Sequence, residues 1–527
     1  MRGRLPSMAG LAGCVIAAMA CSERPLPPPP ETPGSDAGGG GGSTDAGVEQ
    51  PREAGVPPGV VDWGVPIGSQ PSAATPGATE VKAVVATDDG GAIVAGSFDG
   101  MVAFAPDTIR DGTPGKGFVA RYRRDQRLVW VHVLDADAGH VTVADMAALP
   151  DGEIAVAGWF DGTLAEHRDV SPLSVPSAGN KDIFVARLAS DGSVRWFEGA
   201  GGPGDDIARG VAVGMDQAAA ESIAITGAIG EGAVFGAGEP GETHAPPSPG
   251  PTFAARFDGD GKLAWARFAG GGVPGQGYGV AHDGTGAVAI TGYVNGVASF
   301  GPDVNGAPVT IDPNVGRAFV ARWDVAGRLL WAQPLGGMTG EGDAVAIAAN
   351  GLIVATGLFQ GQARFGAAPS APTLTADTPG VDGAYLAAFT SAGATSWARR
   401  LVGIGVHPWR LRAAPDGELL VAASFGGGIK LDPDGPVPLT LFSSGGTDAL
   451  FARLGRDGAL LSAVAGGGPG DDRAADYALA GDGVGWAAGT YFGPATFGAG
   501  SAFGAGTAVL LDSGTDGGSF LLRLLAN

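Results

Sequence analysis

Phe319–Gly337 reads FVARWDVAGRLLWAQPLGG: an apolar strand, a turn, and a second strand that ends in a Gly pair. Within this stretch Arg322 precedes Trp331 by nine positions. The same interval joins Arg121 to Trp130, Arg187 to Trp196, and Arg256 to Trp265. Four pairs at one spacing are not expected by chance. The chain is therefore a repeat array, and the repeat decides the fold before any local pattern does.

The repeat starts at Val60 and recurs about every 66 residues, and three marker positions define it. The Arg markers are Arg121, Arg187, Arg256, Arg322, Arg453 and Arg523, and the Trp markers are Trp63, Trp130, Trp196, Trp265, Trp331 and Trp397. A Gly that closes an apolar strand is the third marker, at Gly96, Gly158, Gly227, Gly292, Gly357 and Gly489. Where a marker is missing, its place is taken by Ala388, Ser462 or Ala423.

Each copy reads as four short strands separated by turns rich in Gly and Asp. With 95 Gly and 39 Pro, and no sustained apolar period of 3.6 residues, the chain is not helical. A short A-x-F-G piece recurs between the Gly strand and the Arg strand, at Val234–Gly236, Ser299–Gly301, Arg364–Gly366 and Thr496–Gly498. Four short antiparallel strands per repeat form the blade of a β-propeller, so the sequence predicts an all-β propeller.

The two ends of the array suggest how the ring closes. The Gly and Arg positions count seven copies, but the chain stops four residues after Arg523, so the last copy has no Trp strand. An extra Trp strand, Val61–Gly68, precedes the first copy. Since a propeller must close to protect its edge strands, this strand should complete the last blade. We expect residues 60–527 to form a single seven-bladed β-propeller closed in this way.

The N-terminal residues predict export. Arg2 and Arg4 precede an apolar stretch that ends in Ala18-Met19-Ala20-Cys21, which resembles a bacterial lipoprotein signal with Cys21 as the lipidated residue. Cys14 follows better lipobox residues but leaves too short an apolar region after Arg4. Residues 1–21 are therefore expected to be a signal peptide, with an ordinary secretory signal or an uncleaved anchor as the alternatives. The chain would be lipid-anchored in the bacterial cell envelope, at the outer membrane or cell surface.

Residues 22–59 are rich in Pro, Gly and Ser and nearly free of apolar side chains, so we expect a disordered tether. The net charge of -22 argues against a nucleic-acid partner, which would require Lys and Arg to neutralise phosphates. The chain has two Cys, both near the N-terminus, so no disulfide is expected in the exported part. We predict no cofactor, and a monomer.

Lys181–Trp196 (KDIFVARLASDGSVRW), together with Gly204–Val213 (GDDIARGVAV) and Ile223–Gly227, resembles a bacterial β-propeller repeat family of secreted and surface proteins. The resemblance covers nearly all of residues 60–527. It implies a propeller and an exported location, and it implies no catalytic residues. The copies depart from the family pattern most at Val406–Pro415 and across Gly238–Pro251.

The pattern A-x-x-D-x-x-G-x-x-x-W, at Ala255–Trp265 and Ala321–Trp331, is similar to the tryptophan-docking motif of two other propeller groups. These are the quinoprotein dehydrogenases and the propeller lipoproteins of outer-membrane assembly. Their repeats are shorter and usually number eight, and the adjacent cysteine pair of the quinoproteins is absent here. The shared motif implies shared blade packing rather than shared function.

The repeated charged residues have structural interpretations. We expect the Arg markers to form ion pairs within or between blades, such as Arg256 with Asp258 and Arg322 with Asp324, and the Trp markers to fill the space between blades. Carboxylates in the loops could collect Ca²⁺, which takes six or more oxygens, at Asp205, Asp206, Asp343, Asp471 and Asp472. No loop has the alternation of an EF-hand, so solvated acidic turns and no metal ion are predicted.

Ile404–Arg412 differs from the other segments that enter a new copy. Those segments are mostly Gly-rich and acidic, whereas this one is basic and aromatic in a strongly acidic protein. Trp and Arg are enriched at binding hot spots, and local departures from a repeat tend to mark function. The predicted partner site is His407, Trp409, Arg410 and Arg412. The alternative is plain divergence, with Trp409 serving as core.

The predicted function is a binding or scaffold module for an envelope or extracellular partner, either a protein or a polysaccharide. No G-x-S-x-G elbow and no paired His indicate a catalytic centre, so no catalytic residue is predicted. A carbohydrate-active hydrolase or lyase remains an alternative, because two carboxylates at a suitable separation are enough for that chemistry. An outer-membrane assembly factor is a third. Close carboxylates with aromatic side chains at one mouth of the channel would favour the enzyme, and a broad apolar outer patch would favour the scaffold.

Overall fold

The computed structural model describes residues 60–69, 78–166, 173–216, 218–247, 250–376, 381–435, 438–498, 505–506, 509–512 and 517–525. Cys21, with the predicted leader and tether, lies outside the described residues. The described residues all fall within one compact unit, Arg52–Asn527. They form β-strands joined by turns and a short 3-10 helix, η1 (Gly337–Thr339), and none of their helices is long and apolar enough to cross a membrane.

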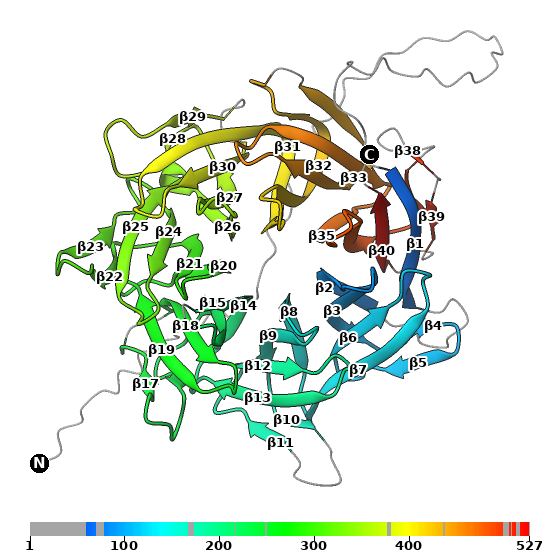
Figure 1. Cartoon of the computed structure of the whole chain (residues 1–527), viewed down its shortest axis with the longest axis horizontal. Helices are drawn as coiled ribbons and strands as arrows, with labels where there is room; N and C mark the ends of the chain where they lie inside the picture. Colours follow the sequence, from blue (N-terminus) through cyan, green and yellow to red (C-terminus); the bar gives the residue numbers. More distant parts are fainter. Residues whose placement is uncertain are drawn as a thin grey trace, which may run out of the picture. The chain divides into compact units, whose positions relative to one another are not determined.

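The strands form four-stranded antiparallel units that follow one another around a common centre (Figure 1). Unit 1 contains β2 (Ala78–Ala86), β3 (Ala92–Asp99), β6 (Lys116–Tyr122) and β7 (Leu128–Asp137). Unit 2 contains β8 (Val141–Ala148), β9 (Ile154–Phe160), β12 (Asp182–Leu188) and β13 (Val194–Ala200). Unit 3 contains β14 (Ile207–Met215), β15 (Glu221–Ala228), β18 (Thr252–Asp258) and β19 (Leu263–Ala269). Unit 4 contains β20 (Gln276–His282), β21 (Val288–Tyr293), β24 (Ala318–Trp323) and β25 (Leu329–Leu335).

Unit 5 contains β26 (Glu341–Ile347), β27 (Ile353–Phe359), β30 (Gly383–Phe389) and the first half of β31 (Thr395–Ala413). Unit 6 contains the second half of β31, β32 (Leu419–Leu431), β33 (Leu439–Leu454) and β34 (Leu460–Gly467). Unit 7 contains β35 (Arg473–Leu479), β36 (Gly485–Tyr491), β40 (Gly518–Leu525) and β1 (Val60–Ser69). We call the first strand of each unit its inner strand and the fourth its outer strand, because the first lies nearest the centre in Figure 1.

Most units carry a further hairpin between their second and third strands, and the four A-x-F-G pieces fall in four of these hairpins. These hairpins are β4 (Met101–Ala105) with β5 (Thr108–Asp111), β10 (Thr163–Glu166) with β11 (Leu173–Pro176), β16 (Val234–Phe235) with β17 (Thr243–His244), β22 (Ala298–Pro302) with β23 (Pro308–Ile311), β28 (Gln362–Arg364) with β29 (Thr373–Thr375), and β37 (Ala495–Phe497) with β39 (Val509–Leu511). β4, β10 and β37 pair with the outer strand of the preceding unit. A short strand β38 (Ala505–Gly506) pairs with β1. These three hairpins therefore connect successive units.

The predicted pairing of the N-terminal strand is observed. β1 runs antiparallel to β40, with Trp63 opposite Arg523, so the strand at the start of the chain completes the last unit. Figure 1 shows β1, in blue, beside β40, in dark red. Units 7 and 1 also meet at their inner strands, where the backbone N–H of Val84 donates to Asp476 Oδ2 at 2.9 Å.

Buried hydrophobic clusters lie between successive units. Each of the seven clusters among the described residues combines side chains of two neighbouring units. The cluster between units 7 and 1 includes Trp486 and Leu521 from the first and Val94 and Phe118 from the second. Because a middle strand contacts a neighbour on both faces, all six residues of β24 are buried. The core is therefore divided among the interfaces.

The Arg and Trp markers make the same hydrogen bonds at several boundaries between units. The indole N–H of Trp265 donates to the carbonyl oxygen of Val325 in the next unit at 3.1 Å, and Arg256 donates to the same oxygen at 3.3 Å. The same shared acceptor occurs three more times, at Ser190 for Arg121 and Trp130, at Gly259 for Arg187 and Trp196, and at Ser391 for Arg322 and Trp331. The nine-residue spacing thus positions two donors for one carbonyl group.

The acidic partners of these Arg residues differ from those predicted. Arg256 pairs with Asp216 at 3.4 Å, from the turn between the first two strands of its own unit. Asp258 instead accepts the backbone N–H groups of its own turn, at Asp260 and Lys262. The same correction applies to Arg322, which pairs with Asp283 rather than Asp324. The prediction followed proximity in sequence, whereas the strand pairing brings the earlier turn closer.

The segment Ile404–Arg412, which enters the sixth copy, is part of a strand. β31 runs through from the outer strand of unit 5 to the inner strand of unit 6, with register shifts between Gly403 and Arg410. Gly405 has a positive φ of 62°. The bulges let one continuous strand change sheets, which the basic and aromatic composition alone did not indicate.

Candidate functional site on the inner strands

Each inner strand contains one extra residue, a β-bulge next to the position of the marker Gly. The bulged residues are Lys82, Ala144, Arg209, Tyr278, Asp343, Trp409 and Ala475. The marker is Gly because a Cβ at Gly357 would lie 2.0 Å from the carbonyl oxygen of Glu341, and one at Gly292 would lie 1.9 Å from that of Gln276. Bulges redirect side chains, so these equivalent positions can carry different chemistry in each unit.

Units 5 and 6 place an acidic and histidine cluster at these positions. Glu341 and Asp343 lie at the start of β26, and His407 lies on β31 in the next unit. One donor atom from each of the three side chains lies within 4.8 Å of the other two. His407 Nε2 and Asp343 Oδ2 are 3.6 Å apart. Two carboxylates and an imidazole therefore converge, which is a donor set suited to protons or to a cation.

The cluster has an excess of negative charge. Burial, followed by the charge of Asp343, raises the pKa of Glu341 to about 7. Burial also raises the pKa of Asp343 above its ordinary value, although His407 opposes this. Burial is the largest single effect on His407 and lowers its pKa, but Asp343, Glu341 and Asp382 together outweigh burial and the net shift is upward. Asp382 adds to the negative potential, and Arg317 reduces it. A positive charge held among these groups would be stabilised.

Trp409 positions the imidazole of His407. Their rings are stacked with centroids 3.6 Å apart and an interplanar angle of 7°. The indole N–H of Trp409 donates to Ser424 Oγ at 2.9 Å, which fixes the indole in turn. Both side chains are partly exposed. Two of the four residues predicted as a partner site therefore adjoin the cluster of Glu341 and Asp343.

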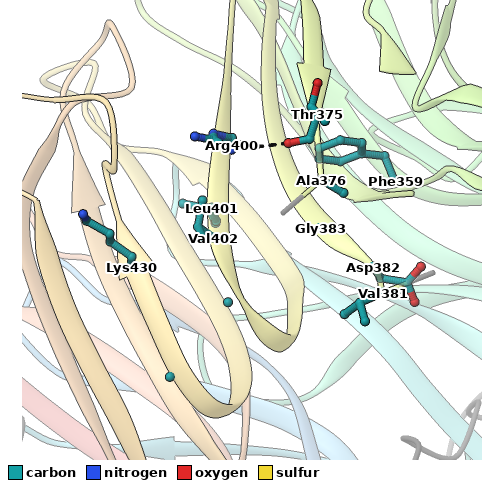
Figure 2. Close-up of a pocket in the computed structure, with 12 residues that line it drawn as sticks. Phe359, Thr375, Ala376, Val381, Asp382, Gly383, Arg400, Leu401, Val402 and Lys430 are labelled. Carbon is teal, nitrogen blue, oxygen red and sulfur yellow. Dashed lines mark hydrogen bonds between the residues drawn. The ribbon is translucent and has the colours of Figure 1, made fainter. Parts of the chain in front are cut away.

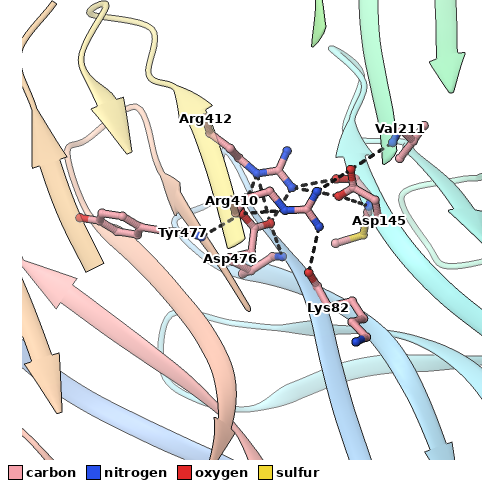
Figure 3. A network of polar contacts seen from close by, with 9 residues as sticks. Lys82, Asp145, Val211, Arg410, Arg412, Asp476 and Tyr477 are labelled. Carbon is pink, nitrogen blue, oxygen red and sulfur yellow. Dashed lines mark hydrogen bonds and ion pairs between the residues drawn. The ribbon is translucent and has the colours of Figure 1, made fainter. Parts of the chain in front are cut away.

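Arg410 and Arg412 bind carboxylates of the protein itself (Figure 3). Arg412 Nη2 lies 2.5 Å from Asp476 Oδ2 in unit 7, and Arg410 Nη1 lies 2.9 Å from Asp145 Oδ2 in unit 2. Arg412 also reaches Asp145 Oδ1 at 3.4 Å. The four residues thus join units 6, 7 and 2 through one network. This network leaves the two guanidinium groups with structural partners.

Backbone groups complete the same network. Asp145 Oδ2 accepts the N–H of Val211 in unit 3 at 3.0 Å, and Asp476 Oδ1 accepts that of Tyr477 at 2.9 Å. Arg412 donates to the carbonyl oxygen of Met146 at 3.1 Å. Arg410 Nε makes no hydrogen bond, but the other contacts of the network favour a single arrangement of the inner strands. The partner-binding role of Arg410 and Arg412 stays a prediction.

A cavity of about 240 Å³ lies between units 5 and 6, near the cluster. Phe359, Leu401 and Val402 form apolar parts of its lining, and Arg400, Lys430 and Asp382 add charges (Figure 2). Arg400 donates to the carbonyl oxygen of Thr375 at 3.4 Å across one side. Asp382 lines this cavity, and its negative charge raises the pKa of Glu341, Asp343 and His407. The cavity is therefore close to the cluster.

The acidic loops are built into the structure. Asp206 is fully buried and accepts the backbone N–H groups of Gly202 and Gly230, both at 2.8 Å. Asp472 is equally buried and accepts those of Gly468 and Phe492 at 2.7 and 3.1 Å. Burial raises the pKa of each carboxyl to about 6. These two carboxylates therefore hold the Gly-rich loops, where the sequence had predicted solvated turns.

No family model matches the chain, and no curated protein matches it. Solved structures similar to it include a protein of unknown function from Dyadobacter fermentans, with 11% identity and a TM-score of 0.38, covering 90% of this chain and 100% of that one. A gluconolactonase from Xanthomonas campestris has 11% identity and a TM-score of 0.29, covering 90% and 99%. A glucose dehydrogenase has 13% identity and a TM-score of 0.31, covering 68% and 95%. The last two are propeller-like proteins. Similarity at this level transfers neither an activity nor a ligand to this chain.

Proposed function

We propose that the chain is an exported, seven-bladed β-propeller that acts as a binding module in the bacterial cell envelope. Three features support a closed ring: the strand exchange between β1 and β40, the backbone contact between units 7 and 1, and the cluster between those units. The leader and the tether support export and lipid attachment at Cys21. Changing Cys21 to Ala should abolish metabolic labelling with a fatty acid, and loss of label only on changing Cys14 would reverse the assignment.

The binding site is placed at the inner strands of units 5 and 6. The observation that carries this placement is the stacked pair His407 and Trp409 beside Glu341 and Asp343. An aromatic ring with adjacent hydrogen-bonding groups suits a polysaccharide, whose sugar rings present both apolar faces and hydroxyl groups. Equivalent positions in units 2 and 7 carry Ala144 and Ala475, so the repeat itself does not require these side chains.

The experiment is a binding screen of the mature protein against purified envelope polysaccharides. Wild-type protein should retain at least one polysaccharide at concentrations where an unrelated acidic protein retains none. Changing Phe442 to Ala is the control, because this aromatic side chain is 53% exposed on β33 and belongs to no site described above. If the changes Phe442→Ala and Trp409→Ala reduce polysaccharide binding equally, the proposed site is rejected.

A hydrolase or lyase acting on the same ligand is the second candidate. The two adjacent carboxylates of Glu341 and Asp343, with the ring of Trp409 nearby, favour it. Hydrolysis of glycosidic bonds uses a pair of carboxyl groups on either side of the bond. Shorter oligosaccharides should then appear when a bound polysaccharide is incubated with the protein, and the change Glu341→Gln should prevent this. If the polysaccharide is still undigested after long incubation, the hydrolase or lyase function is rejected and only the binding function is left.

A further inference from the structure

We propose that Glu341, Asp343 and His407 form a binding site for a divalent transition-metal ion of the Zn²⁺ class. The site lies between two inner strands, with two ligands from unit 5 and one from unit 6. This metal site extends beyond the proposed binding function, because an ion can occupy it whether or not a partner is bound.

The distance between His407 and Asp343 is the first argument. Their Nε2 and Oδ2 atoms are 3.6 Å apart, which is too long for a hydrogen bond. Two ligands of one tetrahedral Zn²⁺, each at ~2.1 Å from the ion, are separated by ~3.4 Å. The observed spacing therefore fits a pair of ligands better than a hydrogen-bonded pair. Glu341 completes the group, with one carboxylate oxygen within 4.8 Å of the ligand atoms of the other two.

The second argument is a buried oxygen that accepts no hydrogen bond. Asp343 Oδ2 is buried and accepts no hydrogen bond, and the side chain of Asp343 is 8% exposed. This oxygen is the atom that faces His407. A buried carboxylate oxygen without a donor destabilises the folded protein. A cation coordinated by this atom and by the imidazole removes the penalty.

Unit 1 provides an internal comparison at the same repeat positions. There, Glu80 stands in the place of Glu341, and Lys82 stands in the place of Asp343. Glu80 and Lys82 form an ion pair with each other, so the first unit carries its own counter-charge. Unit 5 has a second carboxylate where unit 1 has the ammonium group. Its two carboxylates therefore have no ammonium group beside them on their own strand, and His407 faces them from unit 6.

The mixed donor set selects the kind of ion. Ca²⁺ and Mg²⁺ are bound mainly by oxygen, whereas imidazole nitrogen favours Zn²⁺ and other first-row transition ions. Three protein ligands also leave a coordination position open, as in Zn²⁺ sites that bind water or a ligand. The stacked ring of Trp409 fixes the orientation of the imidazole, as outer groups commonly do for metal-binding His.

The test is calorimetric titration of the full mature chain with Zn²⁺ after removal of metals by a chelator. Wild-type protein should bind one equivalent at a site that Asp343→Asn and His407→Gln each weaken by more than about tenfold. Glu80→Gln, at the equivalent place in unit 1, should leave that affinity unchanged. Co²⁺ bound to wild type should show visible absorption bands that His407→Gln alters.

Melting of each metal-free variant shows whether it is folded, and His407→Gln decides the result if Asp343→Asn is unfolded. Exposed pairs such as His140 with Asp161 should bind Zn²⁺ weakly and equally in every variant. Wild-type protein that binds no stoichiometric Zn²⁺, or His407→Gln that binds like wild type, would overturn the site. Tighter binding of Ca²⁺ than of Zn²⁺ at this site would overturn the choice of ion.

Discussion

Gly327 lies against the indole ring of Trp265 across the boundary between units 3 and 4. A Cβ built on Gly327 would lie 2.7 Å from that ring, and the residue has a positive φ of 71°. The turn that carries Gly327 also supplies the carbonyl oxygen of Val325, which accepts the indole N–H. The Gly and the Trp of the repeated motif thus belong to one contact between successive units.

Changing Gly327 to Ala should therefore destabilise the protein in two ways. A left-handed conformation costs about 1–2 kcal/mol for a residue with a Cβ, and the contact with Trp265 adds about 1–3 kcal/mol. Gly306 is the matched control, because its φ is 82° and nothing lies within 4 Å of its Cβ position. Denaturant unfolding measures both variants. Equal losses of stability would show that the contact with Trp265 contributes nothing.

A chain that starts at Ser69 should be much less stable than one that starts at Val60. It lacks most of β1, so the edge of β40 is exposed and Arg523 loses its ion pair with Asp62. An exposed strand edge also favours aggregation. Thermal melting and light scattering of the two proteins make the comparison. Identical melting curves would contradict the role of β1 in unit 7.

Stability should increase as the pH falls from about 7.5 to 5. Burial raises the pKa of Asp206, Asp448 and Asp472 to about 6 in the folded protein, above the ordinary value of 3.8. The folded state therefore takes up protons through pH 6, while the unfolded chain does so only near pH 4. Each group should contribute about 1 kcal/mol more stability at pH 5 than at pH 7.5.

Melting temperature as a function of pH measures this effect. The variant Asp206→Asn removes one of the three groups and should show a shallower rise on acidification. Carboxylates whose pKa is lowered by hydrogen bonds, such as Asp283, lose their contribution only below about pH 4, outside this window. A melting temperature that falls steadily between pH 7.5 and 5 would contradict the assignment of these groups.

Changing Arg412 to Ala should be strongly destabilising. It leaves the carboxylate of Asp476, which is 0% exposed, with Arg410 as its remaining cation at 4.0 Å. Breaking a buried ion pair costs about 3–5 kcal/mol, and the value here should fall at the low end because Arg410 remains. The control is Arg195→Ala, which removes a 59% exposed partner of Glu153 and should cost less than about 1 kcal/mol. Equal effects in urea unfolding would mean that the network is not structurally important.

The repeat made the strand pattern predictable, because Arg256 and Trp265 recur at one spacing and each copy contains the same four strands. The pairing of β1 with β40 followed from the missing last strand. The partner of Arg256 was not predictable from local sequence, because Asp216 lies 40 residues earlier. Glu341 and His407 were also not predicted to lie in one site, although they occupy equivalent positions in consecutive copies. Aligning the inner strands would have brought them together, but no spacing within one copy indicates a contact between two.

The central claim is that the inner strands of units 5 and 6 bind a ligand, and the variant Trp409→Ala tests it most directly. Its affinity for a polysaccharide retained by the wild-type protein should be measured together with its melting temperature. The account predicts that binding is lost while the protein still melts like wild type, because Trp409 is partly exposed and makes a single side-chain hydrogen bond, to Ser424. Unchanged affinity in a variant that melts at a lower temperature would contradict it, and would mean that Trp409 only packs.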